Sequence, residues 1–271
     1  MLLESTQLPT ETCRQAMACQ PSVLAQVLRE APGATSFKEI SARIGSERLS
    51  EICSSATPLE LPRGTSLAAL ARHTLFVSHF CALCVEHYQG SLGGYSSEEA
   101  FFLGSIHDVG MLTFSQSQPS ESRTVCDFAA NASMSFDLAY EALYPTSIVA
   151  EGATFVRQNS GNEALALTLL QFGTGFDATW PDIRSALQIA DHVATSCGYG
   201  WEPWSARSDL PCFVHEALDG NKGTFASLTE KAITLTDNRF PCNEVNKIDH
   251  RTSKFVQSAN HNCKVIDYSR V

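Results

Sequence analysis

Apolar residues in the first 200 positions recur three or four residues apart, and few stretches alternate as a strand would. Residues 20–31 place their apolar side chains on one stripe, which a Pro-Gly pair ends. Residues 36–56 open with Ser36 and Glu39 at the spacing of a capping box. They predict a helix that Gly45 divides into two.

The same spacing predicts helices for most of the chain as far as residue 197. The longest covers 66–88, and the turn GSLGG separates it from a helix that starts at Ser97 and runs to about Phe114. The polar stretch 115–122 is expected to form a loop. The chain is therefore predicted to be all-α. Further helices are predicted at 123–132, 135–143, 146–158, 162–172 and 181–197.

The helical pattern weakens after Gly200. A short helix is still predicted at 224–235, whereas 236–271 is polar and contains few branched apolar residues. We predict three parts: a small helical N-terminal lobe over 1–60, a helical core over 61–200 and an irregular C-terminal extension over 201–271. The aromatic residues that follow the last core helix (Trp201, Trp204 and Phe213) are expected to pack onto the body, and an exposed docking patch is the alternative.

Length and composition indicate a folded protein of the cytoplasm. The chain has 271 residues, of which 44% are hydrophobic and 18% charged, so it can bury a sizeable core. No stretch approaches 18 to 20 uninterrupted apolar residues, which argues against a membrane span. The start MLLESTQLPTETC does not resemble a signal peptide, because it lacks a cationic flank and an apolar run. The ten cysteines are therefore expected to be reduced thiols, mostly buried.

Charge is distributed unevenly. The chain carries a net charge of −10, yet residues 221–271 hold eight Lys/Arg against five Asp/Glu. The first 220 residues thus carry 11 basic and 24 acidic side chains. Phosphate contacts need clustered Lys/Arg, so nucleic acid is not an expected partner of this acidic body.

Two histidines and two aspartates are the candidate chemical residues. His73 lies on the apolar stripe of the longest predicted helix, His107 and Asp108 are adjacent in FFLGSIHDVGML, and Asp191 lies on the buried side of ALQIADHVA. An ionised Asp that faces a core is costly unless it is paired or binds a cation. Two imidazoles and two carboxylates from different helices suit a divalent ion such as Fe, Mn or Zn. From the residue types alone, however, a metal-free structural pair of His73 and Asp191 is the favoured interpretation.

The order and surroundings of these residues resemble the HD-domain superfamily of metal-dependent phosphohydrolases, and most closely its HDOD branch of bacterial signalling domains. LAALARHTLFVSHFCALC is similar to the "WRHS" helix of that branch, EEAFFLGSIHDVGML to its "AFLAGLLHDIGKL" segment, and LQIADHVA to its "HLADRLA" helix. Upstream, SFKEISARIGSERLSEI is similar to an "IxxLGxxRLRxL" stretch in its N-terminal lobe. The likeness covers about residues 8–200 and implies an HD-type helical core.

Departures from the hydrolytic relatives bear on function. Those relatives usually have Lys after HD-x-G, whereas Met111 follows Gly110 in this chain. They also carry further histidines before the last Asp, and this chain has none between Asp108 and Asp191. At most one metal is expected. The resemblance then implies a non-catalytic signalling or scaffold protein that contacts other signalling proteins, and it leaves a homodimer open.

The alternative function is a metal-dependent phosphohydrolase acting on a nucleotide or cyclic nucleotide. In that case Asp108 would be the catalytic residue that bridges the metal and an activated water. Arg72 and Arg157 are the cationic candidates that could stabilise the transition state. A sensor that binds a nucleotide without cleaving it is a third reading. The CxxC of Cys81 and Cys84 falls inside a predicted helix, so both are expected to be buried core thiols.

Overall fold

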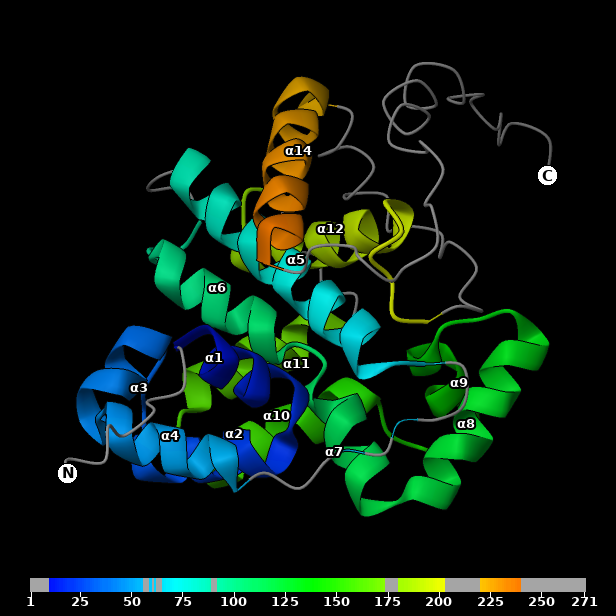
Figure 1. Ribbon diagram of the computed structural model, residues 1–271. Helices are drawn as coiled ribbons and strands as arrows, with labels where there is room; N and C mark the ends of the chain where they lie inside the picture. Colours follow the sequence, from blue (N-terminus) through cyan, green and yellow to red (C-terminus); the bar gives the residue numbers. More distant parts are fainter. Residues whose placement is uncertain are drawn as a thin grey trace.

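A computed structural model describes residues 10–55, 59, 61, 65–88, 92–173, 180–202 and 220–239. Every regular element in these ranges is a helix, which confirms the all-α prediction (Figure 1). The helices are α1 (Thr10–Cys19), α2 (Pro21–Glu30), α3 (Phe37–Ile44), α4 (Ser46–Ser54), α5 (Leu67–His87), α6 (Ser97–Ile106), α7 (Val109–Ser117), α8 (Pro119–Ala132), α9 (Phe136–Leu143), α10 (Ile148–Ser160), α11 (Glu163–Gly173), α12 (Ile183–Ser196) and α14 (Lys222–Arg239).

The N-terminal helices follow the predicted signals, with one addition. The Ser36 side chain caps α3 by accepting a hydrogen bond from the Glu39 amide at 3.2 Å, and Gly45 separates α3 from α4 as expected. Helix α1 was not predicted, because its sequence TETCRQAMAC has few large apolar residues. Its buried side is made by Cys13 and Met17, which join the main apolar core.

The single helix predicted from Ser97 to about Phe114 is wrong: the chain breaks at His107 and Asp108, between α6 and α7. Close backbone contacts fix this break. A methyl group on Gly104 would lie 2.7 Å from the Cα of Ser78 in α5. A methyl group on Gly110 would overlap the carbonyl oxygen of Ile148 in α10. The chain therefore turns between two positions where only glycine allows the helices to approach.

The loop predicted at 115–122 is also wrong. Helix α7 continues to Ser117, and α8 begins at Pro119 after a single intervening residue. Proline is favoured at the first position of a helix because that position needs no backbone donor. The polar side chains that suggested a loop instead lie near the ends of two helices.

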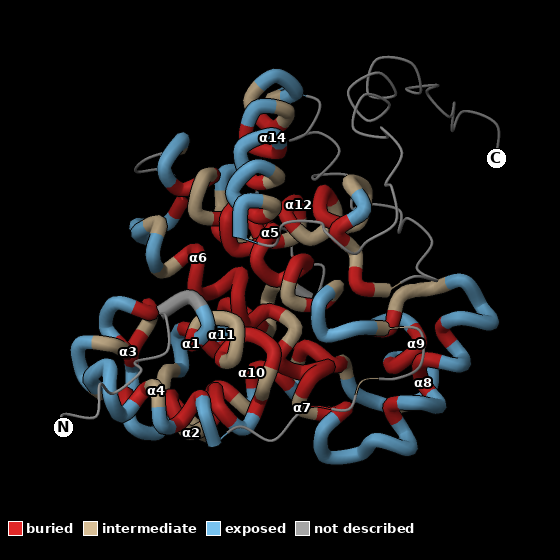
Figure 2. Tube along the Cα trace, viewed as in Figure 1, coloured by how far each residue is buried: buried red, intermediate tan, exposed pale blue. Residues whose placement is uncertain are grey.

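Helix α5 lies at the centre of the molecule, in contact with α1, α6, α12 and α14, and most of its side chains are buried (Figure 2). It is long and apolar enough to cross a membrane, a feature that the search for uninterrupted apolar runs missed. However, 67% of its most apolar window is buried inside the protein. Central helices of water-soluble domains share this composition, because they are covered on all sides.

The C-terminal helix predicted at 224–235 is present and longer than expected, as α14. Its buried residues include Phe225 and Leu228, which belong to the same apolar cluster as Phe76 and Phe80 of α5. The cluster also includes residues of α1 to α4, so the predicted N-terminal lobe and the core share one apolar interior. The rest of the predicted irregular extension, residues 203–219 and 240–271, lies outside the described residues, together with Trp204 and Phe213.

Candidate metal centre

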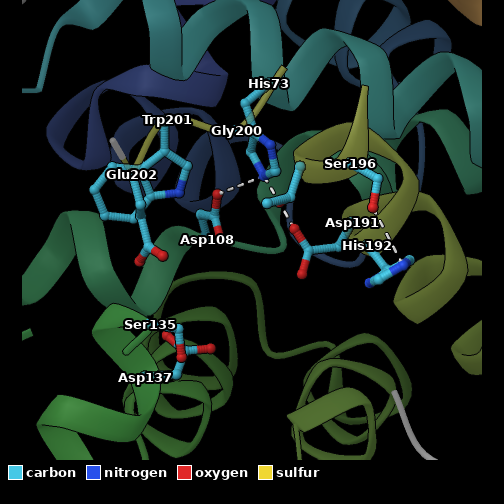
Figure 3. Close-up of a pocket in the computed structure, with 11 residues that line it drawn as sticks. His73, Asp108, Ser135, Asp137, Asp191, His192, Ser196, Gly200, Trp201 and Glu202 are labelled. Atoms are coloured by element: carbon cyan, nitrogen blue, oxygen red, sulfur yellow. Dashed lines mark hydrogen bonds and ion pairs between the residues drawn. The ribbon is translucent and has the colours of Figure 1, made fainter. Parts of the chain in front are cut away.

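The four predicted site residues meet where α5, the α6–α7 turn and α12 come together. Figure 3 shows three of them, His73, Asp108 and Asp191. His73 lies at the centre of the group. Its Nε2 is 3.2 Å from Nε2 of His107, 3.4 Å from Oδ2 of Asp108 and 3.3 Å from Oδ1 of Asp191. Nε2 of His107 is 3.3 Å from Oδ1 of Asp108. Residues separated by more than 100 positions are thus brought to one point.

Backbone carbonyls fix the orientation of both imidazoles. Nδ1 of His73 lies 3.1 Å from the carbonyl oxygen of Tyr199, and Nδ1 of His107 lies 2.7 Å from that of Gly104. A carbonyl can only accept, so both Nδ1 atoms donate. In the neutral rings the lone pairs are therefore on the two Nε2 atoms, which face each other. Two lone pairs at this distance require a proton or a cation between them, and metal-binding histidines are oriented in this way.

Asp108 supplies a second sign of a cation site. Its Oδ2 atom is buried and makes no hydrogen bond, although it lies within ion-pair distance of His73. A buried carboxylate oxygen without a donor is costly unless a cation compensates for it. The ligand atoms of His73, His107 and Asp108 all lie within 4.8 Å of one another. These three residues fit a divalent metal, and the predicted fourth ligand, Asp191, lies beside them with a side chain that is 43% exposed.

The charges of the site shift the pKa values of its members. Burial lowers the pKa of His73, but Asp108, Asp191 and Glu202 outweigh it and raise that pKa to about 9. Burial opposes ionisation of Asp108, yet His107 and His73 lower its pKa below the ordinary value. The pKa of Asp191 is raised, first because the surrounding protein displaces solvent from its partly exposed carboxylate and also by the charge of Asp108. Without a metal, a proton held by His73 therefore stabilises the group.

A pocket of about 170 Å³ opens beside the four residues and contains two acids that the sequence analysis missed. Oε1 of Glu202 accepts a hydrogen bond from the amide of Phe136 at 2.8 Å. Burial, together with the charges of Asp191 and Asp108, raises the pKa of Glu202 to about 7. The second acid, Asp137, lies near the start of α9. The pocket is lined by His73, Asp108, Ser135, Asp137, Asp191, His192, Thr195, Ser196, Gly200, Trp201 and Glu202.

Neither arginine considered for catalysis lines this pocket. Arg72 pairs with Asp237 of α14 at 3.1 Å, and its guanidinium lies over the ring of Tyr199. Arg157 forms an exposed ion pair with Glu163. Among the described residues that line the pocket there is no Lys or Arg. The pocket is therefore suited to a cation and poorly suited to an anion.

The other candidates are core residues. Cys81 and Cys84 are fully buried free thiols, as predicted, and burial raises the pKa of both. Of the three aromatic residues predicted to pack onto the body, Trp201 lies within the described residues. It is buried, and its ring centre is 6.1 Å from that of Phe136.

Comparison with known proteins gives two similar structures. No protein-family model matches the chain, and no curated protein matches its sequence. An HDOD domain protein of unknown function from Geobacter sulfurreducens is 18% identical, with a TM-score of 0.48, over 86% of this chain and 79% of that one. A proposed phosphohydrolase from Shewanella amazonensis is also 18% identical, with a TM-score of 0.49, over 86% of this chain and 91% of that one.

The raised pKa values predict that the metal-free protein loses stability as pH rises. The contribution of Glu202 is fully present below its ordinary pKa of 4.5 and is lost as pH rises through about 7. That of His73 is present below 6.5 and is lost as pH rises through about 9. In EDTA, the Glu202→Gln variant should have the same melting temperature as the wild type near pH 4.5. At pH 8 its melting temperature should be a few degrees higher, since each kcal/mol of unfolding free energy shifts the melting temperature by about 2–4 °C.

Thermal unfolding of both proteins across this pH range measures the effect. Glu151→Gln, which changes an exposed glutamate on α10, is the control and should follow the wild type at every pH. A Glu202→Gln curve parallel to that of the wild type would show that Glu202 does not titrate with folding.

Proposed function

We propose that this chain is a non-catalytic signalling module that binds one divalent metal, either Fe, Mn or Zn, and acts through contacts with other signalling proteins. We place it in the cytoplasm of a bacterium, alone or as a homodimer. The HDOD-like segments support the signalling role. The ligands would be His73, His107 and Asp108, with Asp191 as the fourth.

The observation that carries the non-catalytic assignment is the charge of the pocket. Asp108, Asp137, Asp191 and Glu202 all line it, and the described lining residues include no Lys or Arg. Hydrolysis of a phosphoester requires cationic groups that stabilise negative charge in the transition state. The ionised carboxylates, Asp108 first among them because its pKa is lowered, would instead repel a phosphate group, and no cationic side chain among the described lining residues offsets them.

The site residues are better placed to hold helices together. The carbonyl oxygens of Tyr199 and Gly104 orient the two imidazoles, which come from α5 and from the α6–α7 turn. A metal bound to both would link these two elements, and Asp191 would add α12. In this arrangement the protein side chains bind the ion and fix its position, and metal binding contributes directly to the folding free energy.

The metal-dependent phosphohydrolase is the second candidate, because a metal site beside a pocket is also what hydrolysis requires. When bound, a divalent ion can polarise a phosphoryl oxygen and lower the pKa of water. Asp108 would then hold the ion and orient the attacking water. Asp137 and Glu202 could accept protons from water or a leaving group, but they could not stabilise the developing negative charge.

An activity screen distinguishes the two functions. Wild-type protein supplied with Fe²⁺, Mn²⁺ or Zn²⁺ should hydrolyse p-nitrophenyl phosphate, bis-p-nitrophenyl phosphate and a panel of nucleotides and cyclic nucleotides no faster than the His107→Ala variant with the same metal. Phosphate or nitrophenol release is the measurement. Turnover that disappears in His107→Ala would establish the phosphohydrolase instead.

A further inference from the structure

Helix α14 is connected to the candidate centre through Asp237. Its Oδ1 atom accepts a hydrogen bond from the hydroxyl of Tyr199 at 2.8 Å and pairs with Arg72 at 3.1 Å. The guanidinium of Arg72 also lies 4.8 Å from the centre of the Tyr199 ring. One carboxylate of α14 therefore holds both a residue of α5 and a residue of the turn after α12.

Both of these residues adjoin His73. Arg72 precedes it in α5, and the carbonyl oxygen of Tyr199 accepts the hydrogen bond from its Nδ1 atom. The ring of Tyr199 packs against Phe76, one turn further along α5. The position of Tyr199 thus determines the orientation of the imidazole, and Asp237 contributes to the position of Tyr199.

The rest of α14 is held by apolar contacts. Phe225 stacks on Phe80 of α5 with ring centres 6.1 Å apart, and Leu228 and Ala232 are buried in the same core. In Figure 1, α14 lies along α5 over the upper part of the molecule. Asp237 lies near the C-terminal end of α14, so docking of the whole helix places its carboxylate against Tyr199 and Arg72.

We propose that Asp237 is a positioning residue for His73, and that docking of α14 is thereby coupled to metal binding. The inference rests on the proposed metal centre. Outer-shell partners of metal-binding histidines restrict ring orientation and so increase affinity. Coupling is reciprocal: if docked α14 favours the bound metal, the bound metal favours docked α14 by the same factor.

The experiment measures Zn²⁺ affinity against a competing chelator for the full chain and four variants. Asp237→Ala removes the carboxylate, Asp237→Asn keeps an acceptor but removes the charge, and Tyr199→Phe removes only the hydroxyl. Glu230→Gln, which neutralises an exposed acid on the same helix, is the matched control. Hydrogen exchange of the α14 amides with and without Zn²⁺ gives the reciprocal measurement, and Co²⁺ absorption spectra report on the ligand geometry.

We expect Asp237→Ala to weaken Zn²⁺ binding by up to about tenfold, less than a direct outer-shell partner would because Asp237 contacts Tyr199 and not His73, with smaller losses in Asp237→Asn and Tyr199→Phe. Glu230→Gln should match the wild type. Zn²⁺ should slow exchange across α14 in the wild type but not in Asp237→Ala, and the Co²⁺ spectrum should change in that variant.

Two results would overturn the coupling, and they are distinguishable. If the wild type binds Zn²⁺ and a folded Asp237→Ala variant binds it equally well, the metal centre stands and the role of Asp237 is wrong. If the wild type binds no Zn²⁺, the proposed centre itself is wrong. Circular dichroism and melting of each variant establish that weaker binding does not arise from unfolding.

Discussion

Replacing His107 with Ala is expected to abolish stoichiometric metal binding. Wild-type protein should retain about one equivalent of Fe, Mn or Zn after dialysis, because three or four protein ligands from separate helices bind a divalent ion tightly once they are deprotonated. The variant loses one of two facing imidazoles and leaves the buried Oδ2 atom of Asp108 near a single histidine. Affinity should fall by more than the roughly 10–100-fold that loss of an outer-shell partner costs. Elemental analysis of purified protein measures the stoichiometry.

His192→Ala is the matched control for this experiment. His192 lines the same pocket, but its Nε2 atom contacts Ser196 and it is not part of the three-residue group. This variant should retain the metal of the wild type, whereas Asp108→Ala should lose it. A wild-type protein without metal, with a His107→Ala variant that is merely less stable, would mean that the four residues form a polar network around a proton on His73.

Replacing Gly110 with Ala is expected to destabilise the fold by about 3 kcal/mol or more, at the upper end of the cost of overpacking. The added methyl group would overlap the carbonyl oxygen of Ile148 and lie 2.9 Å from the amide nitrogen of Gly152. Both are backbone atoms of α10, so neither can move aside as a flexible side chain would. Separating α7 from α10 would open the core beside the α6–α7 turn. Urea unfolding followed by circular dichroism measures the change.

Gly223→Ala gives the comparison within the same protein. Gly223 lies in the first turn of α14, and a methyl group there would meet no atom within 4 Å. Since alanine is favoured over glycine in a helix by up to about 1 kcal/mol, this variant should be neutral or slightly more stable. A loss below about 1 kcal/mol in Gly110→Ala would contradict the close packing of α7 and α10.

Local sequence patterns predicted most of the helices and the residues that meet at the site. Apolar spacing and capping signals are properties of short segments, so they identified α2 to α5 and the buried side of α12. The break at His107 and Asp108 was missed because contacts of Gly104 with α5 and of Gly110 with α10 cause it. Those contacts join segments that are distant in sequence.

The two additional acids of the pocket were missed for a similar reason. Glu202 lies in a stretch without periodicity, and its place in the pocket depends on a hydrogen bond to Phe136, a residue distant in sequence. Asp137 is exposed, and nothing in its sequence context distinguishes it from any other surface acid. The aromatic segment WEPW was the local signal that could have identified Glu202, since the buried Trp201 holds the adjacent Glu202 against the body.

The two glycines on either side of the His107–Asp108 turn have a consequence for redesign. Gly104 presses the turn against α5, and Gly110 presses it against α10, so neighbouring helices fix its backbone from both ends. These two glycine contacts do not involve the side chains of His107 and Asp108. The backbone of this segment is thus held in place independently of which metal-binding side chains it carries. An engineer could exchange hard for soft donor atoms there, and so alter ion preference, while retaining the scaffold.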